Sequence, residues 1–431
     1  MKSIFKKIIT KIIQFESRLV LKKYNPKVVA VTGSVGKTST KDAIFSVMSG
    51  SFYVRKSEKS FNSDIGIPLT ILGCPNAWSN PFKWLNNIWE GLRLIIWRQS
   101  YPEWLILEVG ADRPGDIKNI SKWLRPDVVV LTRFAQIPVH IEFFKNRDEI
   151  IKEKWYLVDA LKYDGVLIAN ADDVDAMKMT QRANTRILKY GLLGDADIKA
   201  SNIEIHYEEK TRTPDGMIFK VGYLNNSVPI IIKYSLGMQS IYSSLAAISV
   251  GLSQDVNLVK AGEGLLKHES PKGRMRILLG IKNTTILDDT YNSSPVALHS
   301  ALKALKDIKT KARKIAVLAD MMELGKHSTE EHYEAGKLVA ESSDILMTVG
   351  VRSRRIAEGA LDNGLGELNV FQFDNSVEAG TALQDILREG DIILIKGSQS
   401  TRMERTVEEV MAEPEKAEEL LVRQEEEWKK R

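Results

Sequence analysis

The sequence predicts an α/β fold: a P-loop central domain with a mostly parallel sheet, followed by a C-terminal Rossmann-like, doubly wound domain. Two observations predict it. Short apolar runs recur along the chain, each followed by a helical pattern, and this alternation is typical of parallel sheets. Polar motifs stand directly after several of these runs, and the carboxyl ends of parallel strands are where such sheets bind ligands.

The expected strands fall into two sets, separated near Ser270-Pro271-Lys272-Gly273. We therefore expect a central domain at 27–272 and a C-terminal domain at 273–431. The first set is Lys27–Thr32, Trp104–Val109, Asp127–Thr132 and Gly165–Asn170, and the second is Thr284–Asp288, Lys314–Leu318, Asp344–Val349 and Asp391–Ile395.

Residues 1–26 predict a basic amphipathic helix. Its only acid is Glu16, whereas its basic residues include Lys2, Lys6, Lys7, Lys11, Arg18, Lys22 and Lys23. Its apolar residues at helical spacing are Ile4, Phe5, Ile8, Ile9, Ile12 and Ile13. Such a helix either lies on an anionic membrane or packs on the first domain by its apolar stripe, and both interpretations stay open.

Two further helical segments follow from the pattern. Between Trp78 and Trp104, one face of a helix can be lined by Phe82, Leu85, Trp89, Leu92 and Ile96, and we expect this face to pack in the core rather than to form a membrane or partner surface. The last stretch, from Glu413, predicts a charged helix ending in Trp428.

Composition limits the class of protein. The chain has 431 residues, 43% hydrophobic and 27% charged, which is ordinary for a globular enzyme. The one cysteine, Cys74, excludes an internal disulfide framework and suits a reducing compartment, so we expect a cytoplasmic protein. No apolar run has the roughly 18 residues of a membrane span. A net charge of +5 is too small to imply nucleic acid, which we do not expect as a partner.

The string VTGSVGKTST predicts a phosphate-binding loop after the first strand. Backbone N–H groups from Gly33, Ser34, Val35 and Gly36 can close on an anion at a helix N-terminus, Lys37 can reach the outer phosphates, and the Thr38 hydroxyl can bind Mg²⁺. A glycine-rich turn kept for packing is the alternative, but Gly-Lys-Thr after a buried strand favours a nucleoside triphosphate site.

Two more residues suit that chemistry. Glu108 ends a strand in EVGADRPGDI, where its carboxylate can hold Mg²⁺ directly or through water. His140 follows another strand in AQIPVHIEFF. Taken alone, His140 is more often a structural histidine than a ligand.

Read together, the motifs resemble the Mur ligase family, which makes the peptide of peptidoglycan. The resemblance runs from about residue 20 to the C-terminal end. It is carried in order by VTGSVGKTSTK, SFNSDIGIPLTIL, EVGADRPGDI, PVHIEFF, GRMRIL, DDTYNSSPVALHSAL, IAVLADMMELG and IKGSQSTRMERTVEEV. DDTYNSSP, ADMMELG and KGSQSTRME are most similar to the branch that adds D-alanyl-D-alanine to a UDP-linked muramoyl tripeptide. Folate-type polyglutamate ligases share the loop but not these strings.

The resemblance implies ATP and Mg²⁺ as cofactors and an acyl-phosphate reaction in which the protein mainly positions groups and neutralises charge. It implies that Lys37, His140 and Lys154 are catalytic. The expected metal ligands are Thr38, Glu108, His140 and Lys154. The expected ATP contacts are Gly33, Ser34, Val35, Gly36, Lys37, Thr38, Ser39, Arg274, Asp289, Tyr291 and Asn292. The expected substrate contacts are Asn62, Lys396, Ser398 and Arg402.

Lys154, in EIIKEKWYL, aligns with the family lysine that is carbamylated and becomes an anionic metal ligand. Read without the family it is one lysine of a solvated helix. Trp155 and Tyr156 follow it where the family has a small residue and then an acid, so carbamylation is an open expectation.

Two departures from the family pattern concern the nucleotide and the acceptor. Gln239, Ser240 and Ser243 replace a histidine and two asparagines of a family helix. Only about 27 residues precede the first strand, so we expect the N-terminal UDP-binding domain of the family to be missing and UDP to contribute little to binding.

The expected function is ATP-dependent ligation of D-alanyl-D-alanine to a muramyl peptide carboxylate, by a monomer acting on small molecules, with possible peripheral membrane contact through the N-terminal helix. One alternative is a related ligase joining another amino acid or dipeptide to another carboxylate. The other is a non-catalytic nucleotide-binding subunit, which the Gln239 and Ser243 replacements would favour and which Lys37 and Glu108 argue against.

Overall fold

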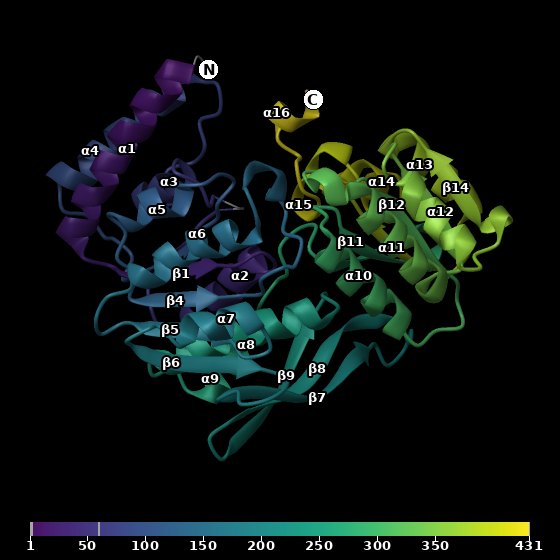
Figure 1. Ribbon diagram of the computed structural model, residues 1–431, viewed down its shortest axis with the longest axis horizontal. Helices are drawn as coiled ribbons and strands as arrows, with labels where there is room; N and C mark the ends of the chain where they lie inside the picture. Colours follow the sequence, from purple (N-terminus) through teal and green to yellow (C-terminus); the bar gives the residue numbers. More distant parts are fainter. Residues whose placement is uncertain (1–2, 59–60, 431) are drawn as a thin grey trace.

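The computed structural model describes residues 3–58 and 61–430, with side chains from Lys6 onward. Lys2 and the side chains of Ile4 and Phe5 therefore lie outside the described residues. Within that part of the chain the strands form two sheets, and Figure 1 shows them side by side, each with helices packed against it. The predicted α/β class with two mostly parallel sheets is confirmed.

The first sheet has the strand order β2-β3-β1-β4-β5-β6-β7-β8-β9. Neighbouring strands from β2 to β7 pair in parallel, whereas β7, β8 and β9 form an antiparallel meander. The strands are β1 (Lys27–Thr32), β2 (Val54–Lys56), β3 (Trp104–Glu108), β4 (Val128–Leu131), β5 (Val166–Asn170), β6 (Arg186–Gly191), β7 (Ile198–Tyr207), β8 (Pro214–Tyr223) and β9 (Asn226–Lys233).

Helices cover both faces of this sheet. Alternate residues of β1 therefore enter different cores: Val29 and Val31 join one cluster, and Val28 and Ala30 join the other. The helices are α1 (Ser3–Tyr24), α2 (Lys37–Met48), α3 (Gly66–Leu72), α4 (Pro81–Ile96), α5 (Asp116–Ser121), α6 (Arg147–Asp159), α7 (Val174–Thr180), α8 (Met238–Ser253) and α9 (Leu258–Leu266).

The second sheet has the order β10-β11-β15-β12-β13-β14, with β10 antiparallel and the other pairs parallel. Its strands are β10 (Arg276–Leu279), β11 (Thr285–Asp289), β12 (Lys314–Ala319), β13 (Ile345–Val349), β14 (Val370–Phe373) and β15 (Ile392–Lys396). Its helices are α10 (Pro295–Asp307), α11 (Ser328–Ser342), α12 (Arg354–Asp362), α13 (Ser376–Ile386), α14 (Glu404–Val410), α15 (Ala417–Leu420) and α16 (Glu426–Lys429).

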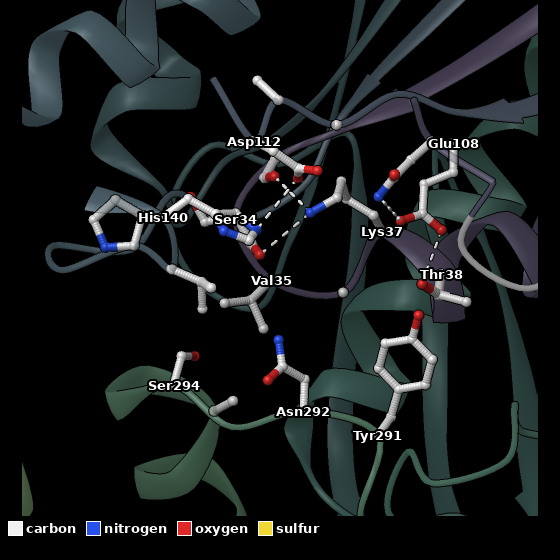
Figure 2. Close-up of a pocket in the computed structure, with 18 of the residues that line it drawn as sticks. Ser34, Val35, Lys37, Thr38, Glu108, Asp112, His140, Tyr291, Asn292 and Ser294 are labelled. Carbon is white, nitrogen blue, oxygen red and sulfur yellow. Dashed lines mark hydrogen bonds and ion pairs between the residues drawn. The ribbon is translucent and has the colours of Figure 1, made fainter. Parts of the chain in front are cut away.

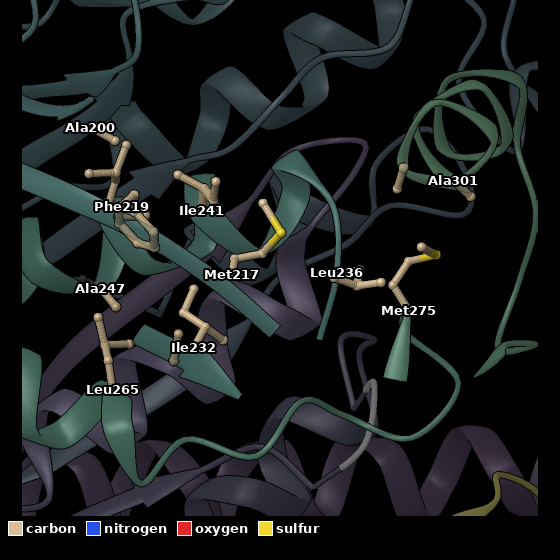
Figure 3. Packing of buried hydrophobic residues seen from close by; sticks show 14 of the residues in the cluster. Ala200, Met217, Phe219, Ile232, Leu236, Ile241, Ala247, Leu265, Met275 and Ala301 are labelled. Carbon is tan, nitrogen blue, oxygen red and sulfur yellow. The ribbon is translucent and has the colours of Figure 1, made fainter. Parts of the chain in front are cut away.

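Apolar packing continues from one sheet to the other. The cluster in Figure 3 contains Met217 and Ile232 of the first sheet, Leu236 and Met275 of the segments that lead out of it, and Ala301 of α10. The two sheets are thus joined by a shared core, and their facing strand ends enclose the site.

Two expectations are wrong, and one feature of the sheets was missed. The stripe from Phe82 to Ile96 points to solvent, because α4 packs inward by Trp84, Asn87, Gly91 and Leu94. The segment from Glu413 is not one helix, because the chain is extended at Leu421 and again at Glu425, between α15 and α16. The antiparallel strands β7 to β9 and β10 were not expected.

The N-terminal helix α1 packs on the first domain, which is one of the two interpretations left open, and the membrane interpretation stays a prediction. Ile9, Ile13 and Val20 are buried against the first domain, whereas Ile8, Ile12 and Phe15 are exposed. Within the described residues, no helix is long and apolar enough to cross a membrane.

Candidate active site

The phosphate loop joins the end of β1 to the start of α2. Gly33 and Gly36 both have positive φ, 144° and 87°. A Cβ at Gly36 would lie 1.9 Å from the Gln239 side-chain nitrogen, and one at Gly33 would lie 1.9 Å from Thr132 Oγ1. Both positions therefore require glycine. The loop ends at the N-terminus of α2, where free N–H groups and the helix dipole favour an anion.

Lys37 turns back onto the loop that precedes it. Its Nζ donates to the backbone oxygens of Gly33 and Ser34 at 3.1 and 3.5 Å. Burial lowers the pKa of Lys37, while the carboxylates of Glu108 and Asp112 act to raise it. The ammonium thus lies beside the anion site, held by carbonyl oxygens that a phosphate oxygen can replace.

Thr38 and Glu108 meet across the start of the helix. Thr38 Oγ1 donates to Glu108 Oε2 at 2.8 Å, and Asn62 Nδ2 donates to Glu108 Oε1 at 3.2 Å. Among the described residues, no group of three or more His, Cys, Asp or Glu side chains forms a metal site. One hydroxyl and one carboxylate beside a phosphate loop nevertheless fit Mg²⁺, which commonly takes few protein ligands and completes its shell with phosphate oxygens and water.

His140 lies between the two domains, at positive φ (70°) before a short 3₁₀ turn. Its Nε2 is 3.4 Å from Asp112 Oδ1, and its Nδ1 is 2.5 Å from Glu323 Oε2. Glu323 belongs to the segment after β12, so this imidazole is the link between carboxylates of both domains. The structure thus gives His140 two acidic neighbours at the edge of the cleft.

Lys154 on α6 faces the same cleft rather than solvent. Its side chain is only 4% exposed, and burial lowers its pKa to about 7, with Lys37 acting in the same direction. No hydrogen bond or ion pair holds its ammonium among the residues that the structure describes. The solvated-helix interpretation of Lys154 is therefore wrong.

The second domain closes the cleft, whose volume is about 370 Å³. Arg274, Tyr291 and Asn292 line it opposite the phosphate loop, and Figure 2 shows Tyr291 and Asn292 across from Val35 and Thr38. The Arg274 guanidinium stacks 4.1 Å from the centre of the Tyr291 ring, and its buried Nε has no hydrogen-bond partner among the described residues. This cation is positioned for an anionic ligand.

Asp289 and Lys396 lie behind that wall as a buried pair. Lys396 Nζ donates to Asp289 Oδ2 at 2.6 Å and to Asn292 O at 2.9 Å, and its side chain is 2% exposed. Asp289 Oδ1 also accepts from Met275 N at 3.2 Å. In this arrangement the Lys396 ammonium is already bonded within the protein, and it fixes the segment that carries Asn292.

A second cavity, of about 510 Å³, adjoins the cleft and shares Val139, His140, Asn292 and Gln399 with it. Ser398 and Arg402 line this cavity as well. Ser398 Oγ accepts from Met322 N at 2.9 Å. The Arg402 guanidinium lies between the Glu404 carboxylate and the Trp428 ring, and it donates to Trp428 O at 2.7 Å.

A smaller cavity, of about 60 Å³, adjoins the other side of the loop and is lined by Ser39, Gln239 and Ser243. Ser243 Oγ lies 3.3 Å from Thr40 Oγ1 and 3.4 Å from Gln239 Nε2. The residues that replace the family histidine and asparagine thus form a hydrogen-bonded group against the phosphate loop. The cleft therefore lies between two cavities, the second cavity on one side and this smaller cavity on the other.

The sequence prediction missed several residues of the site: Asp112, Glu323, Gln399 and Trp428. The first three stand in or next to motifs that had been singled out, so their position after strands was a usable signal. No sequence signal marked Trp428 as a site residue. Its position depends on a contact with Trp78, far away in the sequence, whose ring lies edge-to-face with that of Trp428 at 6.4 Å between centroids.

Comparison with known families and curated proteins gives consistent matches. Residues 86–251 match the description "Mur ligase middle domain", and residues 273–399 match "Mur ligase, glutamate ligase domain". The UDP-N-acetylmuramoyl-tripeptide–D-alanyl-D-alanine ligase of Bacillus subtilis is 26% identical over 399 residues, which is 92% of this chain and 79% of that protein. The corresponding Escherichia coli protein is 26% identical over 386 residues, 88% of this chain and 76% of its own length.

Solved structures show the same fold. MurF ligase from Thermotoga maritima, in complex with ADP, has a TM-score of 0.75 at 23% identity and covers 95% of this chain and 84% of its own. MurF from Acinetobacter baumannii has a TM-score of 0.74 at 24% identity, and the match covers 92% of this chain and 79% of the Acinetobacter chain.

Proposed function

Because the chain belongs to the Mur ligase family, we propose that it is an ATP-dependent ligase of peptidoglycan precursor synthesis, which joins D-alanyl-D-alanine to the carboxylate of a muramyl peptide. One observation carries the proposal: the phosphate cleft adjoins a second cavity and shares wall residues with it, and this second cavity has a cation and hydroxyl groups at its wall. A ligase needs this combination, because an activated carboxylate must meet an amine beside the nucleotide. The two substrates in this proposal are taken from the names of the relatives.

The reaction proceeds in two steps. A carboxylate oxygen of the acceptor attacks the γ-phosphorus of ATP, and the bond to ADP breaks, which gives an acyl phosphate. The amine nitrogen of the dipeptide then attacks the acyl carbon, loses a proton, and displaces inorganic phosphate from a tetrahedral intermediate. Ser34 N and Val35 N donate to Arg133 O, so Lys37 and the N–H groups at the start of α2 would hold the phosphates, and Arg274 faces this site across the cleft. The protein contributes position and charge rather than covalent chemistry.

Thr38 and Glu108 would hold one Mg²⁺, and His140 and Lys154 would help to hold a second. Bound Mg²⁺ supplies neutralisation of the negative charge that develops on the phosphate oxygens. The Glu108 side chain is already oriented for this role by Asn62.

The environment of Lys154 supports carbamylation of this residue. A lysine with a pKa of about 7 is largely neutral at physiological pH, and only the neutral amine can attack carbon dioxide. The N–C bond forms with loss of one proton, and the product is an anion. An anion at this place would relieve the repulsion that Lys154 now experiences from Lys37.

The second cavity would bind the dipeptide through Ser398 and Arg402. D-Alanyl-D-alanine ends in a carboxylate, for which a guanidinium is the strongest side-chain partner. Lys396, also expected to face the substrate, is bonded to Asp289 and does not line this cavity. Arg402 does line it, although its guanidinium is paired with Glu404 and donates to Trp428 O.

The test is release of ADP by the purified protein supplied with ATP, Mg²⁺, a UDP-linked muramoyl tripeptide and D-alanyl-D-alanine. We expect turnover only when both substrates are present, and a product whose mass is that of the two substrates minus one water. L-Alanyl-L-alanine is the matched control for the amine. Turnover only with another carboxylate or amine would replace the substrates, and ATP binding without turnover on any pair would indicate the non-catalytic alternative.

A further inference from the structure

Helix α4 presents an apolar stripe to solvent as well as to the core. Phe82, Leu85, Trp89, Leu92 and Ile96 recur every three or four positions and are all exposed, Phe82 by 79% and Trp89 by 52%. Trp97, directly after the helix, is also exposed and lies edge-to-face with Trp89 at 6.3 Å. Soluble proteins rarely leave so many large apolar side chains together on the surface, so this stripe indicates a contact surface.

Helix α1 lies beside α4 and extends the stripe. Lys23 at the end of α1 donates to the carbonyls of Leu94, Ile95 and Trp97 at 2.9 Å each, and a Cβ at Gly91 would meet the Glu16 carboxylate at 2.3 Å. These contacts make the two helices parallel neighbours, as Figure 1 shows.

With about 100° per residue, the outward residues of both helices then lie on the same side of the pair. We call this surface the outer face. Its residues are Ile8, Ile12, Phe15, Phe82, Leu85, Trp89, Leu92, Ile96 and Trp97.

Exposed basic residues border the outer face. Lys7, Lys11, Arg18 and Lys22 are spaced by four, seven and four positions, so they form one stripe of α1 directly beside its exposed apolar residues. The acid of this helix, Glu16, is buried against α4. On α4, Glu90 is paired with Arg93 at 2.9 Å. The edge of the outer face is therefore positive.

The positive charge at the edge of the outer face favours one kind of binding partner over another. A second copy of the chain would bring two basic stripes close together, which is unfavourable. An anionic bilayer pairs with the lysines, and tryptophan and phenylalanine side chains favour the boundary between headgroups and acyl chains. The outer face is also held rigidly, because Ile9, Ile13 and Trp84 anchor both helices in the core. Docking therefore requires no folding of the helices.

We propose that the outer face docks the protein on the surface of a bilayer that contains anionic phospholipid, with α1 and α4 lying in the plane of the headgroups. This surface is separate from the cleft and does not depend on the proposed ligase activity. The membrane contact is peripheral, in keeping with the absence of a spanning helix from the described residues.

Flotation of the full chain with vesicles tests the proposal. Vesicles of phosphatidylcholine with 30 mol% phosphatidylglycerol should bind the protein at least about tenfold more tightly than phosphatidylcholine alone, since each lysine near an anionic surface contributes about fivefold. Binding should fall steeply with added salt. Equal binding to both vesicles, or binding to neither, would overturn the proposal.

Matched variants separate the apolar and the charged contributions. L85Q/W89Q should lose at least tenfold in binding, and Leu224→Gln, at a still more exposed leucine in a distant turn, should lose nothing. Lys7→Gln with Lys11→Gln should remove the preference for the anionic vesicles, whereas Lys260→Gln on α9 with Lys267→Gln directly after this helix should keep it. Phe82→Ser serves as a second apolar variant if L85Q/W89Q unfolds.

Sedimentation of the free protein tests the rival occupant. We expect no concentration-dependent dimer. A dimer that L85Q/W89Q abolishes, together with unchanged vesicle binding by that variant, would assign the outer face to a second copy and refute docking on a bilayer.

Discussion

Replacement of Lys396 by methionine should destabilise the fold by about 3 to 5 kcal/mol. The ammonium of Lys396 is buried at the end of β15, 2.6 Å from Asp289 Oδ2 and 2.9 Å from Asn292 O. Methionine fills a similar volume but leaves the Asp289 carboxylate inside the protein, where the Met275 N–H is its remaining hydrogen-bond donor among the described residues and Arg274 its remaining nearby cation. A buried charge without its counter-charge is the costly half of a broken ion pair.

Urea unfolding followed by circular dichroism measures this loss. Lys416→Met is the matched control, because Lys416 pairs with Glu413 on the surface and its side chain is 47% exposed. We expect that control to change stability by less than about 0.5 kcal/mol. A double variant, Lys396→Met with Asp289→Asn, should recover at least half of the loss, since an amide carries no charge to bury.

The same variant also decides the role of Lys396. Unchanged stability with a raised KM for D-alanyl-D-alanine would refute the reasoning and return Lys396 to the substrate contacts that the sequence predicted. Lost stability that Asp289→Asn restores would identify Lys396 as a positioning residue for the wall that carries Asn292.

Four further outcomes are expected. Lys37→Ala should lower ADP release about a thousandfold, and near-normal turnover would contradict the loop assignment. Lys154→Ala should be nearly inactive and partly rescued by formate or acetate, whereas an active variant that these do not affect would exclude a carbamate ligand. Arg402→Ala should raise KM for D-alanyl-D-alanine at least tenfold with little effect on KM for ATP, and equal effects would remove Arg402 from the dipeptide site. Burial lowers the pKa of His268 from 6.5 to about 4. The contribution of His268 to the free energy of unfolding should therefore be constant above pH 6.5, and the free energy of unfolding should fall by about 3 kcal/mol as the pH drops to 4. Thermal unfolding against pH should show this slope in the parent but not in His268→Gln.

The parallel strands were predictable because burial on both faces makes them continuous apolar runs. All eight expected strands lie within a residue or two of those observed, β1 at Lys27–Thr32 among them. The meander β7 to β9 was missed because its strands are partly exposed and broken by register shifts near Ser201 and His206, so no continuous run marks them. The phosphate loop needed no tertiary information, since loop, lysine and hydroxyl are neighbours in sequence.

The wrong predictions concern which side of a helix or strand faces the interior of the protein. Helix α4 has two apolar faces, and the sequence offers no means to choose between the face of Phe82 and that of Trp84. Lys396 and Arg402 looked equivalent as cations near a strand end, yet Lys396 is bonded to Asp289 beside the smaller cavity, whereas Arg402 is bonded to Glu404 and Trp428 O and lines the second cavity. The partners that decide these two cases are distant in the sequence, 107 positions for Lys396 and Asp289 and 71 for Lys23 and Leu94 where α1 meets α4, and local patterns do not encode them.

The position of β15 has a consequence for synthesis of the chain on the ribosome. This strand, residues Ile392–Lys396, sits between β11 and β12 in the middle of the second sheet. The first sheet is complete once β9 has left the exit tunnel, so a nascent chain can display the loop Gly33–Thr38 long before the opposite wall of the cleft exists. Until β15 emerges, the edges of β11 and β12 that it will join stay apart and unpaired, for about 100 residues of elongation after β11 and about 70 after β12. Open strand edges attract other chains. Release of a stalled chain before residue 392 should therefore yield a product that retains a phosphate loop, cannot carry out ligation, and aggregates through its second half.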